Sequence, residues 1–303
     1  MDASFHGIYG NPPPALLAVP RDAVQFSPLM VGTAALEDQP LASLQSITIL
    51  APPGTLERRY VLAAALQALA PGSTLTALAL KDKGGNRIAA ELTAFDCDVA
   101  EESRSHYRIC TTQRPALLQG IEAALAEGSP QQYPAHGLWT QPGIFSWDRI
   151  DAGSALLLQH LPKFTGRGAD LGCGLGMLAS AALTSTSVES ITLVDTDRRA
   201  VAMAKRNITD PRAAFLWTDV RQHLPLTALD FIVMNPPFHD AGMEDQTLGQ
   251  TFITRAAALL KTGGKCWLTA NRHLPYEALL AQHFTRHELV AQADGFKIYA
   301  AEK

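Results

Sequence analysis

The sequence predicts an α/β protein built from two domains, and three observations support that prediction. The chain has 303 residues, which is longer than a single hydrophobic core commonly organises. Apolar runs of strand length alternate with helical runs along most of the chain, which is the pattern of strands and helices in a parallel sheet. A stretch rich in Gly, Pro, Ser and Gln, residues 126–143, interrupts this alternation. We therefore expect one α/β domain over residues 1–130 and a second over residues 131–303.

The composition is that of an ordinary globular protein and does not by itself indicate a nucleic-acid partner. Hydrophobic residues make up 47% of the chain and charged residues 18%, and the formal net charge is -4. Without a basic excess, any RNA contact has to come from local patches such as "DRRAVAMAKR", residues 197–206. A solvated helix face is the simpler interpretation of that run.

Nothing in the sequence predicts a membrane segment, a disulfide framework or a metal site. The first residues lack the charged and apolar regions of a signal peptide, and the longest apolar run, residues 60–70, is too short to span a bilayer. His283 and His287 have a spacing that suits a metal, but no third ligand accompanies them. The four cysteines are far apart and form no Cys-x-x-Cys pair: Cys97, Cys110, Cys173 and Cys266. We expect a cytoplasmic protein, monomeric and without a bound metal.

The elements of the first half follow an α/β order. Residues 46–50, 74–80 and 106–110 read as strands, and residues 56–70 as a buried helix. The alternation implies a parallel sheet. The turn after the first of these strands, "APPGTLERR", holds one glycine, so this half lacks the glycine-rich turn that lets a cofactor approach the backbone. We expect an α/β domain without a nucleotide site.

The second half repeats the strand–helix alternation more clearly. Strands are expected at residues 166–172, 190–195, 213–217, 230–235 and 264–270. Helices are expected at residues 154–161, 177–183, 198–208, 250–260 and 276–284. Residues 287–292 and 296–302 would close the sheet as an antiparallel pair. This plan of seven strands is the Rossmann-like plan of many transferases that use a small-molecule cofactor, although a fold does not fix chemistry.

The first chemical motif is the glycine-rich turn "ADLGCGLGMLA" at the end of the strand that begins at residue 166. It contains Asp170, Gly172, Gly174 and Gly176, in the spacing D-x-G-x-G-x-G. Glycines here allow positive φ and close approach of a ligand to the backbone. A dinucleotide fingerprint would read G-x-G-x-x-G, with a pyrophosphate at the helix N-terminus. The tighter spacing favours a nucleoside without phosphates, although a plain strand–helix turn is the alternative.

Two further carboxylates follow the next two strands. Asp195, with Thr196 beside it, ends an apolar strand, where a carboxylate can accept hydrogen bonds from both hydroxyls of a ribose. Asp197 is better placed to cap the following helix, which leaves Asp195 for the ribose. Asp219 follows strand 213–217 and can accept from an adenine amino group, while the N–H of Val220 meets a ring nitrogen. An Asp after a strand is commonplace, so this last interpretation depends on the other two.

The stretch "LDFIVMNPPFHD", residues 229–240, carries the most specific signal. Pro236 and Pro237 end the strand, because proline cannot donate to a sheet ladder. An exocyclic amine on a flat base is a poor nucleophile, because its lone pair is conjugated into the ring. The Asn235 side-chain oxygen and the Pro236 carbonyl could hold its two N–H groups and aim the lone pair at a sulfonium methyl. Phe238 would stack on the base, and a simple turn is the alternative.

With these residues in place, the chain resembles the bacterial ribosomal RNA guanine-N2 methyltransferases, most closely those of the small (16S) subunit. The resemblance covers both halves and is strongest over "PGIFSWDRIDAGSALLL", "DLGCGLGMLA", "NPPFHDAG", "ANRHLPYE" and "FKIYAAE". It implies a class I S-adenosyl-L-methionine-dependent methyltransferase fold for the second domain. It also implies that Phe145, Ser146, Asp151 and Gly153 help to enclose S-adenosylmethionine; an ordinary loop and a helix cap are the alternative. The first domain would be a degenerate copy without a cofactor site, with a possible role in holding RNA.

The expected function is transfer of a methyl group from S-adenosylmethionine to the N2 amine of a guanine in 16S ribosomal RNA within the small subunit. A sister family acting on a large-subunit guanine shares "NPPFH" and "ANRHL", so that substrate stays open. Methylation of a protein glutamine amide, for which two acceptors would work equally well, is a further alternative. So is a ribosome-assembly factor without catalysis. For His239 two interpretations stay open, contact with substrate and a plain hydrogen bond. We expect Cys173 to be a small filler and Trp217 to be a core residue.

Overall fold

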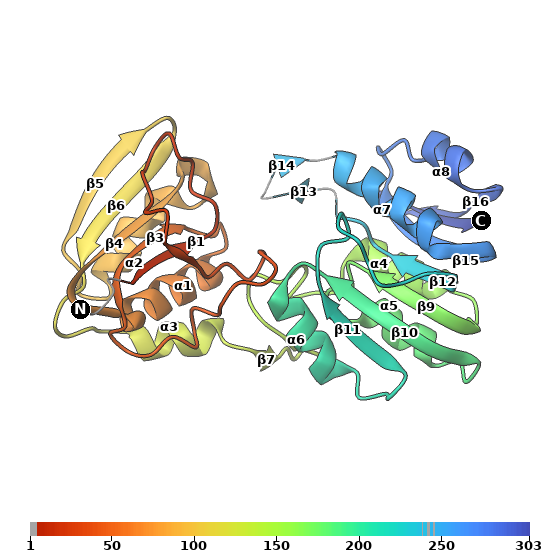
Figure 1. The fold of residues 1–303 in the computed structure, drawn as a ribbon, viewed down its shortest axis with the longest axis horizontal. Coiled ribbons are helices and arrows are strands. Elements are labelled where there is room, and N and C mark those ends of the chain that lie inside the picture. Colours follow the sequence, from red (N-terminus) through yellow and green to blue (C-terminus); the bar gives the residue numbers. More distant parts are fainter. Residues whose placement is uncertain (1–4, 238, 241–242, 245) are drawn as a thin grey trace. The chain divides into compact units, whose positions relative to one another are not determined.

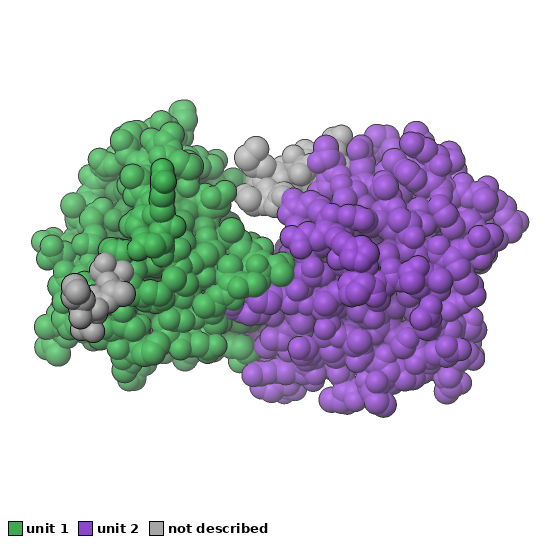
Figure 2. All heavy atoms as spheres, in the orientation of Figure 1, with its two compact units in different colours: residues 1–130, 141–143 green, residues 131–140, 144–303 purple. Residues whose placement is uncertain are grey.

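The computed structural model describes residues 5–237, 239–240, 243–244 and 246–303. They form two compact units, which Figure 2 shows in two colours. Unit 1 comprises the chain up to residue 130 together with residues 141–143, and unit 2 comprises residues 131–140 and 144–303. Each unit has its own sheet and its own buried apolar core. No helix among the described residues is long and apolar enough to cross a membrane.

Unit 1 contains a six-stranded mixed sheet in the order β2-β1-β3-β4-β6-β5. Its strands are β1 His6–Tyr9, β2 Val24–Gln25, β3 Leu44–Leu50, β4 Leu69–Leu80, β5 Val99–Arg104 and β6 Tyr107–Gln113. Its helices are α1 Thr55–Ala68, α2 Ile88–Thr93 and α3 Ile121–Gly128, with short 3-10 turns η1 Lys81–Lys83 and η2 Gly85–Arg87. Strands β3 and β4 pair in parallel, as expected, and β1 and β2, which were not predicted, also pair in parallel.

The expectation of an all-parallel sheet is wrong at residues 106–110. Strand β6 runs antiparallel to β4, and β5 runs antiparallel to β6. The β5–β6 hairpin turns through Ser105 and His106, which both have positive φ, at 48° and 69°. A two-residue turn of this kind is usually signalled by Asn-Gly or Asp-Gly, so Ser-His gave no such signal. Strand β5 is the sheet edge and is largely exposed, and its sequence "VAEESR" has the charges that protect an edge strand.

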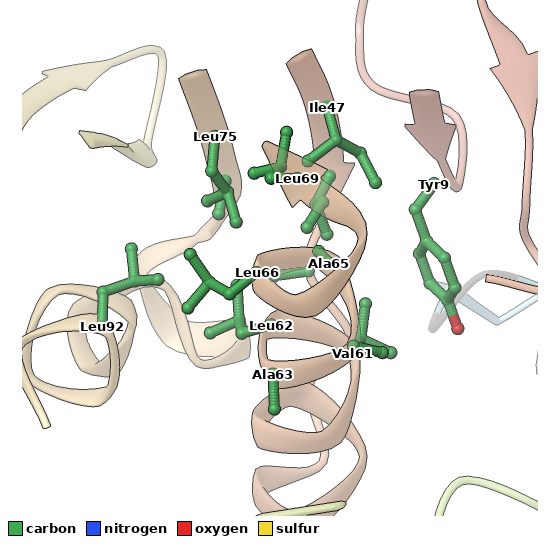
Figure 3. Packing of buried hydrophobic residues seen from close by; sticks show 14 of the residues in the cluster. Tyr9, Ile47, Val61, Leu62, Ala63, Ala65, Leu66, Leu69, Leu75 and Leu92 are labelled. Carbon is green, nitrogen blue, oxygen red and sulfur yellow. The ribbon is translucent and has the colours of Figure 1, made fainter. Parts of the chain in front are cut away.

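The core of unit 1 is built on α1, whose side chains from Val61 to Leu66 are all buried. In Figure 3, Leu62 and Leu66 point toward Leu92 of α2, and Val61 lies on the side of Tyr9. Arg58 is fully buried at the start of the same helix. Its guanidinium pairs with Glu91 at 2.6 Å and donates to the carbonyls of Pro52 and Pro53. The loop after β3 is thus tied down by an arginine of this chain.

Unit 2 contains a seven-stranded sheet, as predicted, and its strand order is β11-β10-β9-β12-β15-β17-β16. Figure 1 shows β11, β10, β9 and β12 side by side in this sheet. Its strands are β9 Gly166–Leu171, β10 Val188–Asp195, β11 Ala213–Trp217, β12 Leu229–Met234, β15 Leu260–Asn271, β16 Arg286–Ala293 and β17 Phe296–Glu302. Its helices are α4 Ala152–His160, α5 Met177–Leu183, α6 Arg198–Asn207, α7 Gln246–Leu259 and α8 Glu277–His283. The predicted antiparallel closing pair is confirmed, and β17 lies between β15 and β16. A further two-stranded ladder joins β13 His239–Asp240 to β14 Met243–Glu244.

The stretch predicted as a linker, residues 126–143, is more ordered than its composition indicated. It holds the end of α3 and a small hairpin of β7 Gln131–Gln132 and β8 Trp139–Thr140. Asn207, the last residue of α6, accepts from the Trp139 N–H at 2.8 Å and donates to the Trp139 carbonyl at 3.0 Å. The same amide donates to the Leu175 carbonyl at 3.1 Å. One side chain therefore joins the hairpin to the glycine-rich turn.

Candidate active site

The predicted functional residues of unit 2 gather at one edge of its sheet. Strand β9 lies between β10 and β12, and Leu171 pairs with Val194 on one side and Met234 on the other. The residues that follow these positions, Gly172, Asp195 and Asn235, therefore leave the sheet at the same edge. The carboxyl edge of a parallel sheet is where such folds bind ligands.

A pocket opens at this edge and brings together part of the predicted set. It is lined by Phe145, Ser146 and Arg149, by Asp151 and Ser154 at the start of α4, by the glycine-rich turn and by Asn235. Cys173 belongs to this lining as a buried residue. Burial raises the pKa of its thiol well above the ordinary value, so it is a poor nucleophile.

The three glycines of the turn have different local reasons for being glycine. Gly172, Gly174 and Gly176 have positive φ, at 73°, 51° and 84°. A Cβ on Gly174 would meet no atom within 4 Å, so this position faces open space. A Cβ on Gly176 would lie 2.8 Å from the Ile208 side chain, so this glycine permits packing beneath α5. Of the three, Gly174 is the one with open space at its Cβ position.

Asp170 is completely buried behind this turn. Its Oδ2 accepts from the Ala179 N–H at 3.0 Å, which satisfies a donor in the first turn of α5. Its Oδ1 has no hydrogen-bond partner among the described residues. Burial, opposed by the Ala179 hydrogen bond and assisted by the charge of Asp195, raises the pKa of Asp170 to about 7. A carboxyl group with a pKa close to neutral pH therefore lies beside the glycine-rich turn.

Asp195 links the glycine-rich turn to the strand beside it. Its Oδ1 accepts from the Asp197 N–H and its Oδ2 from the Gly174 N–H, both at 2.9 Å. Burial raises its pKa to about 6, although the hydrogen bonds from the Asp197, Gly174 and Thr196 backbones act in the opposite direction. Asp197 caps α6 by accepting from the Arg199 N–H, as the sequence predicted. The cap of α6 is therefore made by Asp197, and the side chain of Asp195 takes no part in it.

The side-chain amide of Asn235 is held by two acceptors. Its Nδ2 donates to Asp151 Oδ2 at 2.9 Å and to Ser154 Oγ at 2.8 Å. Asp151 also caps α4 by accepting from the Ser154 N–H at 2.8 Å. With the nitrogen committed to both residues, Oδ1 is the atom of this amide that remains to accept from another molecule. The cap at Asp151 and the orientation of Asn235 are one hydrogen-bonded unit.

Ser154 was not singled out from the sequence as a functional residue. Its hydroxyl reaches Asn235 across 81 positions of the chain, a separation that no local pattern reveals. The one available signal was the Asp-x-x-Ser spacing of a helix start, which predicts the cap and nothing about Asn235. Arg149, which pairs with Asp148 and lines the same pocket, was also missed.

The remaining predicted positions differ in how the structure places them. Pro236 and Pro237 follow the end of β12 as expected, and Phe238 lies outside the described residues. Phe145 is 59% exposed and Ser146 has a positive φ of 52°. At Gly153 a Cβ would lie 2.6 Å from the Phe296 ring, so packing against the sheet requires a glycine there, and its implied cofactor contact stays a prediction.

The residues expected around an adenine adjoin Asp195 but lie outside the pocket lining. The Thr218 N–H donates to the Asp195 carbonyl at 3.0 Å, and the Trp217 Nε1–H donates to the Thr196 carbonyl at 2.9 Å. Trp217 is half-buried, so its expected place in the core is wrong. Val220 is buried. Asp219 accepts from the backbone and the guanidinium of Arg221, and although burial raises its pKa, these hydrogen bonds leave it below its ordinary value.

Known proteins resemble both the whole chain and its second half. The family model of the methyltransferase small domain matches residues 135–300. The "Ribosomal RNA small subunit methyltransferase C" of Pseudomonas paraeruginosa is 32% identical over 265 residues, which are 83% of this chain and 77% of that protein. A protein of the same name from Psychromonas ingrahamii is 28% identical over 265 residues, 83% of this chain and 74% of its own.

A solved structure shares the fold. It is the 16S rRNA N2 methyltransferase of T. thermophilus in complex with AdoMet and guanosine, with a TM-score of 0.79 and 23% identity. The match covers 99% of this chain and 88% of that chain. The family model spans more than half of this chain, and the relative from P. paraeruginosa aligns with most of it. The chain belongs to the family of ribosomal RNA small subunit methyltransferase C, and its second half is a methyltransferase small domain.

Proposed function

We propose that this chain transfers a methyl group from S-adenosylmethionine to the N2 amine of a guanine in 16S ribosomal RNA, with unit 2 as the catalytic domain. The observation that carries the proposal is the fixed amide of Asn235, held at the end of β12 beside the glycine-rich turn. Family membership supports the same reaction class, since the matched relatives are named as small-subunit rRNA methyltransferases.

The residues present fit S-adenosylmethionine. Gly174 offers an open backbone position, and Asp170 Oδ1 is a buried acceptor without a partner among the described residues. Asp195 would accept from the ribose hydroxyls, and Asp219 and Val220 would flank the adenine. On the side of α4, the cofactor would be enclosed by Phe145, Ser146 and Asp151. The glycine-rich turn would take its shape from Gly172 and Gly176, and Thr196 would line the end of β10 beside it. When bound, the cofactor supplies an electrophilic methyl group on a sulfonium.

The part played by Asn235 in the reaction follows from its hydrogen bonds. Asp151 and Ser154 hold the amide nitrogen, so Oδ1 can accept one N–H of the guanine amine while the Pro236 carbonyl accepts the other. Two acceptors reduce the conjugation of the amine with the ring and direct its lone pair, which is catalysis by orientation. Pro236 and Pro237 hold the carbonyl direction because proline fixes φ. The proton leaves after methyl transfer, so the site needs no strong general base. Stacking of the base on Phe238 is part of the proposal from sequence alone.

For unit 1 we propose a role in supporting or positioning RNA rather than in binding cofactor. The loop after β3 has its Pro52 and Pro53 carbonyls bonded to buried Arg58, and it has one glycine. A single copy of unit 2 contains all residues of the proposed site, so a monomer suffices. The substrate would be the small ribosomal subunit, which places the protein in the cytoplasm.

The test is transfer of radiolabelled methyl groups from S-adenosylmethionine to small and large ribosomal subunits and their naked RNAs, all lacking native methylation. We expect label in 16S RNA as N2-methylguanosine, and its loss in Asn235→Ala. Asn86→Ala is the matched control, because Asn86 is an exposed asparagine of unit 1. Label in the large subunit alone would show that the substrate is a guanine of the large-subunit rRNA. Label in protein alone, or in nothing, would overturn the rRNA proposal.

A further inference from the structure

The outer face of α6 carries a ridge of basic side chains. Arg198, Ala202, Lys205 and Arg206 are spaced i, i+4, i+7 and i+8, which places them on one stripe of a helix. Ala202, Lys205 and Arg206 are exposed and Arg198 is half-buried. The opposite face of the helix, with Val201, Met203 and Ala204, is buried. We call Arg198, Lys205 and Arg206 the α6 ridge.

Each cation of the α6 ridge lies over an aromatic ring. Arg198 is 5.5 Å from the centre of the Trp217 ring and Lys205 is 5.9 Å from that of Phe215. Both rings belong to β11, the edge strand of the sheet. Arg206 is 4.8 Å from the ring centre of Trp139 in the β7–β8 hairpin. Such contacts restrain the cation, and those of Lys205 and Arg206 leave the N–H groups of these two side chains available to a partner. A freely solvated helix face, the simpler interpretation from the sequence, does not account for three such contacts.

Lys205 and Arg206 of the α6 ridge differ from neighbouring arginines, which are paired with carboxylates. Arg199 pairs with Asp197, Arg212 with Asp210 and Arg221 with Asp219. In the part of the chain that the structure describes, neither Lys205 nor Arg206 has a carboxylate within ion-pair distance. A protein with a net charge of -4 thus has a local basic surface beside its proposed active site.

We propose that the α6 ridge binds phosphate groups of the substrate RNA next to the target guanine; this inference depends on the function proposed above. Helix α6 begins three residues after Asp195, so the ridge starts at the ligand-binding edge of the sheet. It extends about 12 Å from Arg198 to Arg206, given a helical rise of ~1.5 Å per residue. A basic run of this length can contact several successive phosphates of a nucleic-acid backbone.

The test compares charge-reversal variants of the full chain in methyl transfer to naked 16S RNA lacking native methylation. Lys205→Glu together with Arg206→Glu should raise the KM for RNA by about 10-fold or more, with kcat and the KM for S-adenosylmethionine within about 2-fold of wild type. The dependence of RNA affinity on salt should also weaken, by a slope of about 1 to 2 in a log–log plot, because fewer counterions are released. Lys163→Glu is the matched control, because Lys163 is an exposed lysine of the same unit outside α6.

Two further results decide between this inference and its alternatives. Lys205→Arg with Arg206→Lys keeps both charges and should keep the KM for RNA near that of wild type; a loss equal to that of the glutamate variant would show a structural defect and overturn the inference. An unchanged KM for RNA in the glutamate variant, with methyl transfer intact, would also overturn it. Absence of methyl transfer to any RNA by the wild-type protein would instead overturn the proposed function.

Discussion

At the residue scale, the cap of α4 also fixes the side-chain amide of Asn235. The carboxylate that caps α4, Asp151, also accepts from the Asn235 amide, and Ser154 donates its backbone N–H to that carboxylate while its hydroxyl accepts from Asn235. Removal of one of these contacts should let the Asn235 amide rotate, while the pocket should still bind the cofactor. We therefore expect such a change to lower the rate of the chemical step and to leave cofactor affinity nearly unchanged.

Ser154→Ala should therefore lower kcat by about 10-fold, because a lost hydrogen bond of ~1 to 1.5 kcal/mol lets the Asn235 amide rotate. The KM for S-adenosylmethionine should change by less than about 3-fold. Steady-state kinetics with saturating RNA measures both, Ser154→Thr should recover much of the rate, and Ser180→Ala on the exposed side of α5 is the control. A rise in KM with an unchanged kcat would show that Ser154 does not position Asn235.

Asp170 makes stability depend on pH. Its pKa is about 7 in the folded protein because of burial, above its ordinary value of about 4 in an unfolded chain. The folded state therefore holds the proton more tightly, so the free energy of unfolding falls as pH rises from about 4 to about 7, by roughly 2 to 4 kcal/mol.

Asp170→Asn removes that ionisation and can still accept from the Ala179 N–H. We expect the variant to gain stability relative to wild type as the pH rises from 5 to 8. Urea titrations of both proteins at each pH measure the difference. A difference that stays constant with pH would contradict the assignment of this ionisation to Asp170.

At the scale of elements, the junction at Asn207 joins α6 to the β7–β8 hairpin and to the glycine-rich turn. Asn207→Ala removes three hydrogen bonds and should weaken S-adenosylhomocysteine binding by roughly 5-fold or more, since about 1 kcal/mol is lost when the Leu175 carbonyl loses its donor. Asn207→Asp keeps the acceptor for the Trp139 N–H and loses both donors, so it should weaken binding similarly. Calorimetric titration measures both. Unchanged affinity in both variants would show that the junction does not shape the cofactor turn.

The elements that could be predicted from sequence are those whose signal is local. Apolar runs identified β9, β10, β11, β12 and β15, and the helices between them. Short strands such as β1 and β2, and the charged edge strand β5, carry too few apolar residues for such a pattern. The β7–β8 hairpin has the composition of a linker and is ordered by Asn207, which lies 68 positions away from Trp139.

The site divides in the same way. Gly174, Asp195 and Asn235 were predictable because each follows a strand that the pattern identifies, and ends of neighbouring parallel strands meet. The hydrogen-bond partners of these residues were not predictable, because they depend on tertiary structure. Asn235 donates to the Ser154 hydroxyl, and the Gly174 N–H donates to Asp195. Gly153 looked like part of a cofactor motif, and its proximity to Phe296 becomes visible only when α4 is packed on the sheet.

At the scale of the whole molecule, the apolar core of each unit is made from its own residues. The main cluster of unit 1 runs from Tyr9 to Ala124, and the two large clusters of unit 2 lie between Leu156 and Ala301. Separate cores should unfold as separate cooperative transitions in calorimetry. A substitution in one core should then shift one transition.

Arg58→Ala tests this, because it leaves Glu91 without the buried partner that neutralises it. Loss of one member of a buried pair costs about 3 to 5 kcal/mol, so the transition of unit 1 should fall by about 10 °C or more. Arg59→Ala is the matched control, since Arg59 forms a partly exposed pair with Glu127 that contributes little. Movement of both transitions by Arg58→Ala would show that the two cores unfold together.

The place of β17 has a consequence for how the protein is made. Strand β17 follows β16 in the chain, yet it lies inside the sheet, paired with β15 on one side and β16 on the other. A nascent chain that ends before them leaves β15 with an open edge and β16 without a neighbour. At about 5 to 20 residues per second, unit 1 has several seconds or more to fold while unit 2 is still being translated. The sheet of unit 2 therefore stays incomplete until β17 has been synthesised, and a ribosome that stalls before that point leaves an aggregation-prone edge exposed.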